Sequence, residues 1–146
     1  MELTQKQQEG LELTLERYKN GERYVVISGY AGTGKSTLVK FIISALQQEY
    51  DIDPETDVVY TSFTGKATQV LQKKGNKNVS TLHKLLYEWY PRKDGTFFKR
   101  PISYLDFKIV VVDEVSMVPM ELMTLLFSHQ NIFIICLRRP RTITTN

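Results

Sequence analysis

The sequence predicts an α/β domain with a mostly parallel central sheet and right-handed crossovers. Segments with the apolar runs of strands alternate along the chain with segments that have the spacing of amphipathic helices. Residues 109–112 form a continuous β-branched run, which is typical of a parallel strand covered on both faces. A glycine-rich turn connects the first predicted strand to an apolar helix. The length of 146 residues is enough for one such domain with a real hydrophobic core.

The amino-terminal half of the chain carries clear local signals. Leu11, Leu15 and Tyr18 recur at helical spacing, and Asn20-Gly21 supplies a stop after them. Pro54 lies in a polar segment that we expect to be a turn. The expected elements are a helix between residues 4 and 20, a strand at 24–28, a helix that ends near residue 50, a strand at 58–62 and a helix at 65–74.

The carboxyl-terminal half is expected to continue the alternation. Ser80 can cap a short helix at residues 81–87. The segment 90–101 contains prolines and a glycine and has no steady apolar period, so we expect an exposed loop or hairpin there. Pro119 suits the first turn of a helix. The remaining expected elements are a strand at 109–112, a helix at 119–127 and a strand at 131–137.

Charge and cysteine content limit the sites that the chain can hold. The formal net charge is +3, but three arginines lie in the last nine residues, and the rest of the chain has 16 basic and 16 acidic residues. Net charge therefore gives no argument for nucleic-acid binding. Cys136 is the only cysteine and lies in an apolar run, which excludes a disulfide within the chain and predicts a core thiol.

Metal clusters and membrane segments are not expected. His83 and His129 are the only histidines, so the chain lacks the residues for a cluster of histidine and cysteine ligands. The first ten residues are polar, and the longest apolar run, 132–137, is far too short to span a bilayer. We expect a cytoplasmic protein with no membrane partner.

A phosphate-binding pattern follows the first predicted strand. Residues 29–36 fit G-x-x-x-x-G-K-[ST], the Walker A motif or P-loop, at every required position. The glycines let the backbone curl round a phosphate, Lys35 adds a cation for the β- and γ-phosphates, and Ser36 offers a hydroxyl to Mg2+. A glycine-rich turn with a chance lysine is the alternative, but the flanking strand and apolar helix favour a nucleotide site. The expected nucleotide-binding residues of this loop are Gly29, Ala31, Gly32, Thr33, Gly34, Lys35, Ser36 and Thr37.

An acidic pair ends the β-branched run, in the form of a Walker B element. Asp113 and Glu114 would stand at the carboxyl end of a buried strand, which is where ligands bind in open α/β sheets. We expect Asp113 and Ser36 to hold Mg2+, and Glu114 to orient and deprotonate the water that attacks the γ-phosphate. An acidic pair that only ends a strand is common, but the upstream phosphate loop favours catalysis. The expected catalytic residues are Lys35, Asp113 and Glu114.

Four segments together resemble superfamily 1 helicases of the RecD/Dda-like branch. They are Leu3-Thr4-Gln5-Lys6-Gln7, Phe63-Thr64-Gly65-Lys66-Ala67, Thr81-Leu82-His83 and Asp113-Glu114-Val115-Ser116-Met117. The match runs from residue 3 to about residue 137, and Val115 departs from the family's usual small residue. The resemblance implies a three-layer RecA-like P-loop NTPase domain, helicase domain 1A, at residues 1–137. It also implies ATP and Mg2+ as cofactors, single-stranded DNA as partner and a second RecA-like domain in cis.

The resemblance assigns roles that simpler local roles can also explain. It gives adenine recognition to Gln7, which could instead complete a helix capping box with Thr4. It gives contacts with DNA phosphates to the segment 64–66, which could instead be a helix start with a solvated lysine. His83 is a DNA contact by resemblance or a packed or capping histidine by local context. The implied DNA-binding residues are Thr64, Gly65, Lys66, Thr81 and His83.

Aromatic and basic residues are mixed in the segment 87–100. Such a mixture could stack bases and hold phosphates, or it could be a hairpin that packs its aromatic side chains on the domain. Both interpretations remain open from the sequence. The residues are Tyr87, Trp89, Tyr90, Arg92, Lys93, Phe97, Phe98, Lys99 and Arg100.

The final residues depart from the family. Where its members continue with motif III, Gly-Asp-x-x-Gln-Leu-Pro-Pro, this chain reads Arg-Arg-Pro-Arg-Thr-Ile-Thr-Thr-Asn at 138–146. Codons for these residues, read one nucleotide later, can spell Gly-Asp-Pro-Gly-Gln-Leu-Pro-Pro. We hypothesise that 138–146 is a frameshifted, aberrant tail, which the nucleotide sequence would test; the alternative is a natural short extension.

The sequence therefore predicts the ATP-binding motor domain of an ATP-dependent DNA helicase, truncated before motif III. Since a second domain normally supplies a transition-state arginine, we expect this fragment to be inactive as a helicase on its own. Two alternatives remain from the sequence. One is a non-catalytic nucleotide- or DNA-binding module, and the other is a P-loop kinase of small molecules.

Overall fold

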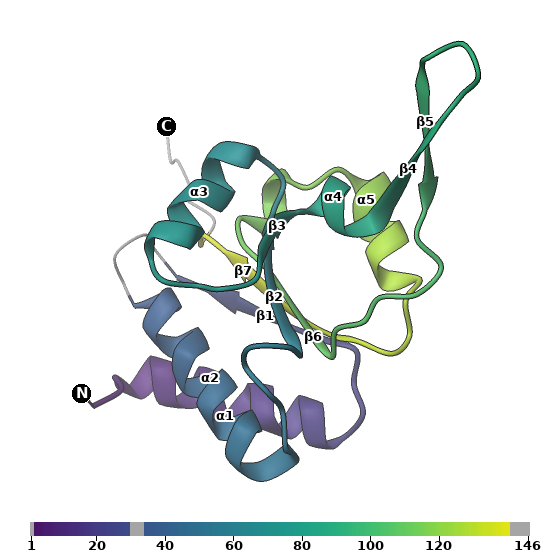
Figure 1. Ribbon diagram of the computed structural model, residues 1–146. Helices are drawn as coiled ribbons and strands as arrows, with labels where there is room; N and C mark the ends of the chain where they lie inside the picture. The colour runs from purple at the N-terminus through teal and green to yellow at the C-terminus, as the bar shows by residue number, and fades with distance from the viewer. Residues whose placement is uncertain (1, 30–33, 141–146) are drawn as a thin grey trace.

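A five-stranded parallel sheet forms the centre of the molecule. The computed structural model describes residues 2–29 and 34–140. The strands lie in the order β1-β7-β6-β2-β3, and every neighbouring pair is parallel (Figure 1). The strands are β1 (Tyr24–Ser28), β2 (Val58–Ser62), β3 (Val79–Thr81), β6 (Ile109–Val112) and β7 (Phe133–Arg138). The predicted α/β fold with a mostly parallel sheet is confirmed.

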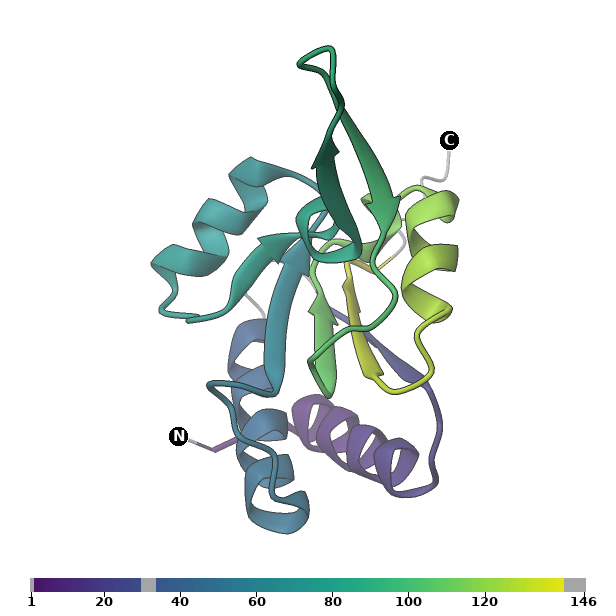
Figure 2. The same ribbon diagram turned by 45° about the vertical axis from the view of Figure 1, so that its right-hand side comes forward.

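Helices cover both faces of this sheet and produce three layers (Figure 2). α1 and α2 contribute to the core on one face, and α4 and α5 to the core on the other. α3 lies against the β2–β3 edge. The helices are α1 (Gln5–Lys19), α2 (Lys35–Tyr50), α3 (Gly65–Lys73), α4 (Leu82–Leu86) and α5 (Met120–Phe127), with a 3-10 turn η1 (Val115–Met117).

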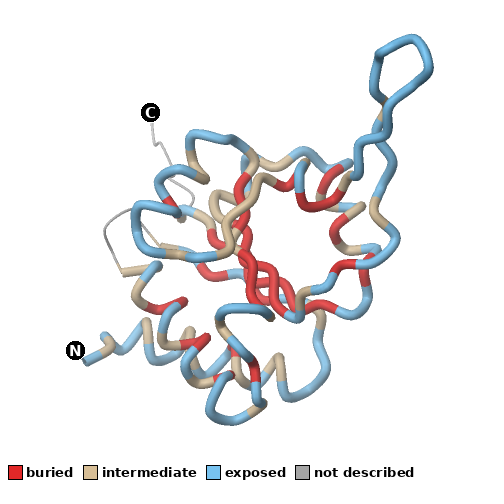
Figure 3. The backbone as a smooth tube through the Cα atoms, in the orientation of Figure 1, coloured by how far each residue is buried: buried red, intermediate tan, exposed pale blue. Residues whose placement is uncertain are grey.

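The hydrophobic core consists of two clusters, one on each face of the sheet, and the β-branched run of β6 contributes to both. Ile109 and Val111 belong to the cluster under α1 and α2, whereas Val110 and Val112 belong to the cluster under α4 and α5. All four side chains are buried because the strand lies in the middle of a sheet covered on both faces. Figure 3 shows buried residues concentrated in these central strands. Cys136 is also buried there, and burial raises its pKa to about 11, as expected of a core thiol.

Several boundaries differ from the sequence-based expectations. The strand β3 was not anticipated, because it has only three residues, all half-buried. Ser80 lies in β3 and does not cap the next helix; Thr81 does, since its hydroxyl accepts from the Lys84 backbone N–H at 3.2 Å. The last strand begins at Phe133 and extends to Arg138.

The segment after α4 forms a hairpin that projects from the domain (Figures 1 and 2). Its strands, β4 (Tyr87–Pro91) and β5 (Phe97–Pro101), pair antiparallel as a separate two-stranded sheet. The expectation of a loop or hairpin is therefore confirmed as a hairpin. Among the described residues, no helix is both long and apolar enough to cross a membrane.

Candidate nucleotide-binding site

The predicted site residues gather at the carboxyl edge of the sheet. Backbone pairing continues past the strand ends there: Gly29 donates to Arg138 at 3.0 Å, and Asp113 donates to Thr61 at 2.8 Å. Gly29 and Asp113, the first residues after β1 and β6, are therefore hydrogen-bonded to neighbouring strands. This edge is where parallel α/β sheets bind ligands.

The described part of the phosphate loop has a backbone that favours glycine. Gly34 precedes α2 with φ of 85°, in the left-handed region, and its carbonyl accepts from Leu38 at 2.8 Å. A β-carbon at this position would lie 2.3 Å from the Nε2 atom of Gln7. Lys35, Ser36 and Thr37 form the first turn of α2. The predicted residues Ala31, Gly32 and Thr33 lie outside the described residues.

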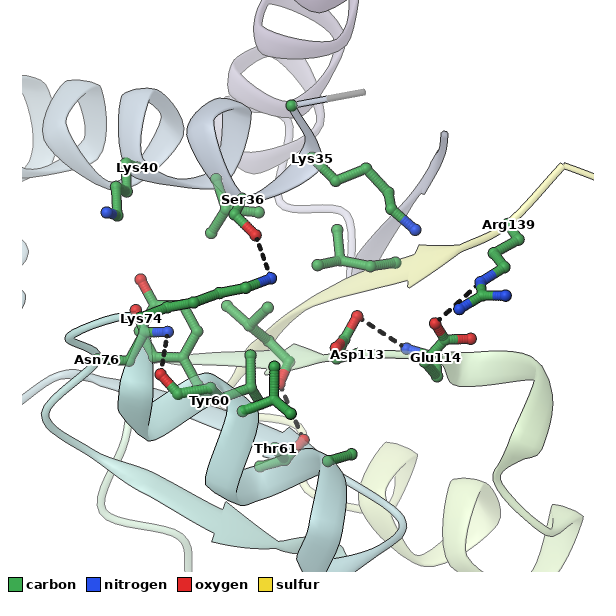
Figure 4. Close-up of a pocket in the computed structure, with 17 residues that line it drawn as sticks. Lys35, Ser36, Lys40, Tyr60, Thr61, Lys74, Asn76, Asp113, Glu114 and Arg139 are labelled. Atoms are coloured by element: carbon green, nitrogen blue, oxygen red, sulfur yellow. Dashed lines mark hydrogen bonds and ion pairs between the residues drawn. The ribbon is translucent and has the colours of Figure 1, made fainter. Parts of the chain in front are cut away.

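One cavity of about 570 Å³ brings the predicted catalytic residues together (Figure 4). Lys35 and Ser36 reach it from α2, and Asp113 and Glu114 reach it from the end of β6. These two pairs are far apart in the sequence, and the phosphate loop and the acidic pair were predicted separately. Tyr60 also lines the cavity, and burial raises its pKa.

The acidic pair has a strained backbone. Glu114 adopts φ of 51°, one of two positive values among the described non-glycine residues. Such a conformation costs about 1 kcal/mol and tends to persist at functional sites. The backbone N–H of Glu114 donates to Asp113 Oδ1 at 3.1 Å, and its Oε1 forms an ion pair with Arg139 Nε at 3.2 Å. In this structure the candidate catalytic base is therefore already paired.

The oxygen atoms in this cavity fit Mg2+. The Ser36 hydroxyl and the Asp113 carboxylate line the same space, and Mg2+ commonly takes one or two protein oxygens together with water and substrate phosphates. A cationic group already contacts the serine, since Lys74 Nζ donates to Ser36 Oγ at 3.2 Å. Ser36 and Asp113 would hold the ion, which would neutralise charge on the phosphates. The described residues contain no cluster of three or more histidine, cysteine and acidic side chains.

A second cavity has a volume of about 620 Å³. It is lined by Gln7 and Gly10 of α1, by Val26 and Ile27 of β1, and by Gly34. The wall exposes mainly apolar surface, and the amides of Gln5 and Gln7 are among its polar groups, a combination that suits a flat base with polar edges. Because Gly34 and Lys35 line both cavities, they mark the boundary between the two spaces.

Gln7 fulfils the simpler of its two expected roles. Its backbone N–H donates to Thr4 Oγ1 at 3.2 Å, and its Oε1 accepts from the Thr4 N–H at 2.9 Å, which completes the capping box. The Nε2 atom also donates to the Gly34 carbonyl at 3.2 Å. The same amide therefore reaches the cavity that suits a base.

The residues implied for DNA binding follow β2 and β3, which are neighbours in the sheet. Thr64 begins α3, and its hydroxyl accepts from Ala67 at 3.1 Å; Thr81 begins α4 in the same manner. Gly65 and Lys66 form the exposed first turn of α3. Capping is therefore observed at both threonines, and it leaves the predicted DNA contacts as proposals.

His83 lies between two aromatic rings. Its ring centroid is 6.0 Å from that of Phe63 and 6.0 Å from that of Tyr87, onto which it stacks. Packing is therefore observed at His83, where it connects the end of β2 with the base of the hairpin, and the predicted DNA contact stays a proposal.

Most residues of the projecting hairpin are exposed (Figure 3). Trp89 is 60% exposed and Phe97 is 62% exposed, so these two rings do not pack on the domain. Other rings lie under cations: Lys99 Nζ is 4.5 Å from the centre of Tyr87, and Arg100 is 5.1 Å from that of Phe98.

Two cavity residues were missed at the sequence level. Lys74 ends α3, and nothing in the sequence connects it to Ser36, 38 residues earlier. Arg139 was assigned only to the tail, although it lines the cavity and contacts Glu114. Both contacts depend on tertiary packing, of α3 on β2 and β3 and of β7 beside β6, which no local pattern reports.

Comparison with known proteins gives one family match. Residues 15–135 match the family model described as "AAA domain".

Two proteins with described functions or structures are similar to the chain. It is 31% identical over 134 residues to the "ATP-dependent DNA helicase dda" of Enterobacteria phage T4, covering 87% of this chain and 29% of that protein. The chain thus spans less than a third of the length of this relative. A solved structure, the large terminase of the HK97 bacteriophage, aligns with a TM-score of 0.54 at 16% identity, covering 94% of this chain and 33% of that one. At this identity the likeness supports the fold alone.

Proposed function

The chain belongs to the AAA domain family and is a superfamily 1 helicase-like P-loop domain, and on this premise we propose that it is the ATP-binding part of a DNA motor. In the whole protein, ATP hydrolysis would drive movement along single-stranded DNA. The observation that carries the proposal is the single cavity lined by Lys35, Ser36, Asp113 and Glu114. The similarity to the T4 protein, an ATP-dependent DNA helicase, supports the choice of DNA.

Each residue of the cavity has a separate task in this proposal. Lys35 binds the β- and γ-phosphates, and the start of α2 faces the same anion. Ser36 and Asp113 would hold Mg2+, which would neutralise charge on the phosphates, and Glu114 would orient the attacking water and take its proton. Gln7 would read the adenine from the second cavity. The phosphate contacts would be completed by Gly29, Ala31, Gly32, Thr33, Gly34 and Thr37.

The DNA path in this proposal crosses the carboxyl ends of β2 and β3. Thr64, Gly65 and Lys66 would contact phosphates, together with the segment 81–83. These contacts need short donors and one cation, which the exposed start of α3 offers. The exposed rings of the hairpin would stack on bases.

The remaining partner in this proposal is a second RecA-like domain. Closure of that domain over the nucleotide would bring the arginine that stabilises transition-state charge, worth about 10^3 to 10^5 in rate in related systems. The match covers 29% of the T4 relative, so a protein of that kind has room for such a domain.

A non-catalytic nucleotide- and DNA-binding module is the second candidate. The ion pair between Arg139 and Glu114 favours it, because the guanidinium occupies the Oε1 atom that would accept the proton of the attacking water. Under this candidate, the chain binds ATP without turning it over.

The test measures ATP binding and hydrolysis, with and without single-stranded DNA. The motor proposal expects binding that requires Lys35, so Lys35→Ala loses it, while Lys40→Ala, on the same helix and lining the same cavity, retains it. It also expects DNA-stimulated turnover in a version whose gene is read one nucleotide later after codon 137. Binding without turnover in both versions would favour the module, and phosphate transfer to a small acceptor would point to a kinase.

A further inference from the structure

Lys74 reaches the nucleotide cavity from outside every motif of the chain. It ends α3, is exposed, and extends along the cavity to Ser36 (Figure 4). Its Nζ atom donates to Ser36 Oγ at 3.2 Å. The hydroxyl that is proposed to hold Mg2+ therefore already has a positive charge beside it.

We propose that Lys74 is a positioning residue of the nucleotide site, whose ammonium group stands at Ser36 in place of the metal ion and gives way to it. This inference rests on the proposed ATP site. Without metal, the ammonium holds the serine hydroxyl and offers its charge to the phosphates of an incoming nucleotide.

The charges around Lys74 support this role. Among the ion pairs between described residues, none includes Lys74, so its charge is not neutralised by an acidic side chain within 4.0 Å. The described part of the cavity contains two carboxylates, and Glu114 is paired with Arg139. Lys74 is thus a cation without an acidic partner at the proposed binding site for nucleotide phosphates and Mg2+.

Metal binding would displace the ammonium. Mg2+ binds oxygen at about 2.1 Å, so an ammonium on the same hydroxyl would lie within about 4 Å of a doubly charged ion and be repelled. Lysine has a flexible four-carbon stem, and this one is exposed, so its end can turn toward phosphate oxygens without moving α3.

The expected signature is a weaker dependence of ATP affinity on Mg2+ in the native chain than in variants without the Lys74 charge. In Lys74→Met, affinity for ATP in EDTA should fall about fivefold, the size expected for an exposed charge pair. Affinity with saturating Mg2+ should change by about twofold or less, because the ion replaces the lost charge. The ratio of the ATP affinity with Mg2+ to the ATP affinity in EDTA should therefore increase.

The test is calorimetric titration of ATP into the native chain, Lys74→Met, Lys74→Arg and Lys73→Met, each with EDTA and with Mg2+. Lys73→Met removes a charge from the same helix, at a residue that does not line the cavity, and Lys74→Arg retains the charge; both should keep the native ratio. Thermal unfolding without ligand checks that each variant folds.

Two results would overturn the inference. If the native chain binds ATP through Lys35 and the ratio in Lys74→Met equals the native ratio, Lys74 has no metal-replacing role and the proposed function stands. If the native chain binds no ATP under either condition, the proposed function and this inference both fail.

Discussion

The side-chain amide of Gln7 donates from Nε2 to the carbonyl oxygen of Gly34, 3.2 Å away. Its other end, Oε1, accepts from the Thr4 backbone in the capping box of α1. One side chain therefore connects the start of α1 with the end of the phosphate loop. The two functions use different atoms, so substitutions can separate them.

Gln7→Glu should retain the capping box and lose the base contact. Glutamate is accepted at this position of the box but has no N–H to donate. Gln7→Ala should lose both, lowering the free energy of unfolding by about 1 kcal/mol. We expect ATP affinity to fall about fivefold in both variants, the size of one hydrogen bond, with a smaller preference for ATP over GTP. Thermal unfolding and nucleotide titration measure the two effects. Unchanged base preference in Gln7→Glu would contradict the adenine role.

Thr64→Asp should distinguish capping from DNA binding at the start of α3. Aspartate is a good N-cap, so stability should remain within about 0.5 kcal/mol of the native value, whereas Thr64→Ala should cost about 1 kcal/mol. A carboxylate beside a DNA phosphate is repelled, so affinity for single-stranded DNA should fall several-fold at low salt. Fluorescence anisotropy of a labelled oligonucleotide measures the affinity.

A charge control is available on the same helix for this DNA experiment. Gln69→Glu adds a negative charge at an exposed position of α3, away from its first turn. If Gln69→Glu weakens DNA binding as much as Thr64→Asp does, the effect is general repulsion and the proposed contact at Thr64 is wrong.

Trp89 provides a direct optical test of the hairpin because it is the only tryptophan in the chain. The register pairs Trp89 with Lys99 and Pro91 with Phe97. Trp89, Phe97 and the cationic Lys99 therefore share one face of the hairpin. Single-stranded DNA should quench Trp89 fluorescence if bases stack on it.

Removing the ring should weaken DNA binding. Stacking of one base on an aromatic side chain contributes about 1 to 3 kcal/mol, so Trp89→Ala should lower affinity at least about fivefold, and Trp89→Phe should lose less. Phe97→Ala should weaken binding with the fluorescent reporter still in place. Saturating DNA, verified by anisotropy, that leaves Trp89 emission unchanged would show that this face does not contact bases.

The parts of the fold that could be predicted from the sequence carry strong local signals. Strands β1, β2 and β6 were predicted with their observed bounds, because each is a run of β-branched and aromatic residues that ends at a turn or a motif. Part of the cavity was also predictable, since Lys35 and Asp113 come after such strands and parallel strands end at one edge.

The parts that could not be predicted depend on tertiary packing. β3 exists because it pairs with β2, with Ser62 opposite Thr81, and not because its own three residues favour a strand. Lys74 enters the nucleotide cavity because α3 packs on β2 and β3 and lines the same space as α2, and lysines at helix ends are otherwise ordinary. The aromatic residues of the hairpin fit packing or exposure equally well in sequence, and only the projection of β4 and β5 decides between them.

His129 should make stability depend on pH in the mildly acidic range. The side chain is 7% exposed, and its Nε2 atom has no hydrogen-bond partner among the described residues. Burial lowers the pKa of His129 from its ordinary value of 6.5, because the charged ring would lose its hydration. Above pH 6.5 the ring is mostly neutral in both folded and unfolded chains, and its contribution to stability is fully present.

As pH falls below 6.5, the unfolded chain takes up the proton first, so the free energy of unfolding decreases until the pH reaches the lower pKa of the folded state. His129→Gln removes the titrating group and should show a shallower fall in melting temperature between about pH 7 and pH 5. His83→Gln, which replaces the other histidine at a half-exposed position, is the matched substitution control. If the melting temperatures of the native chain and His129→Gln fall equally over this pH range, burial of His129 does not control the loss of stability in acid.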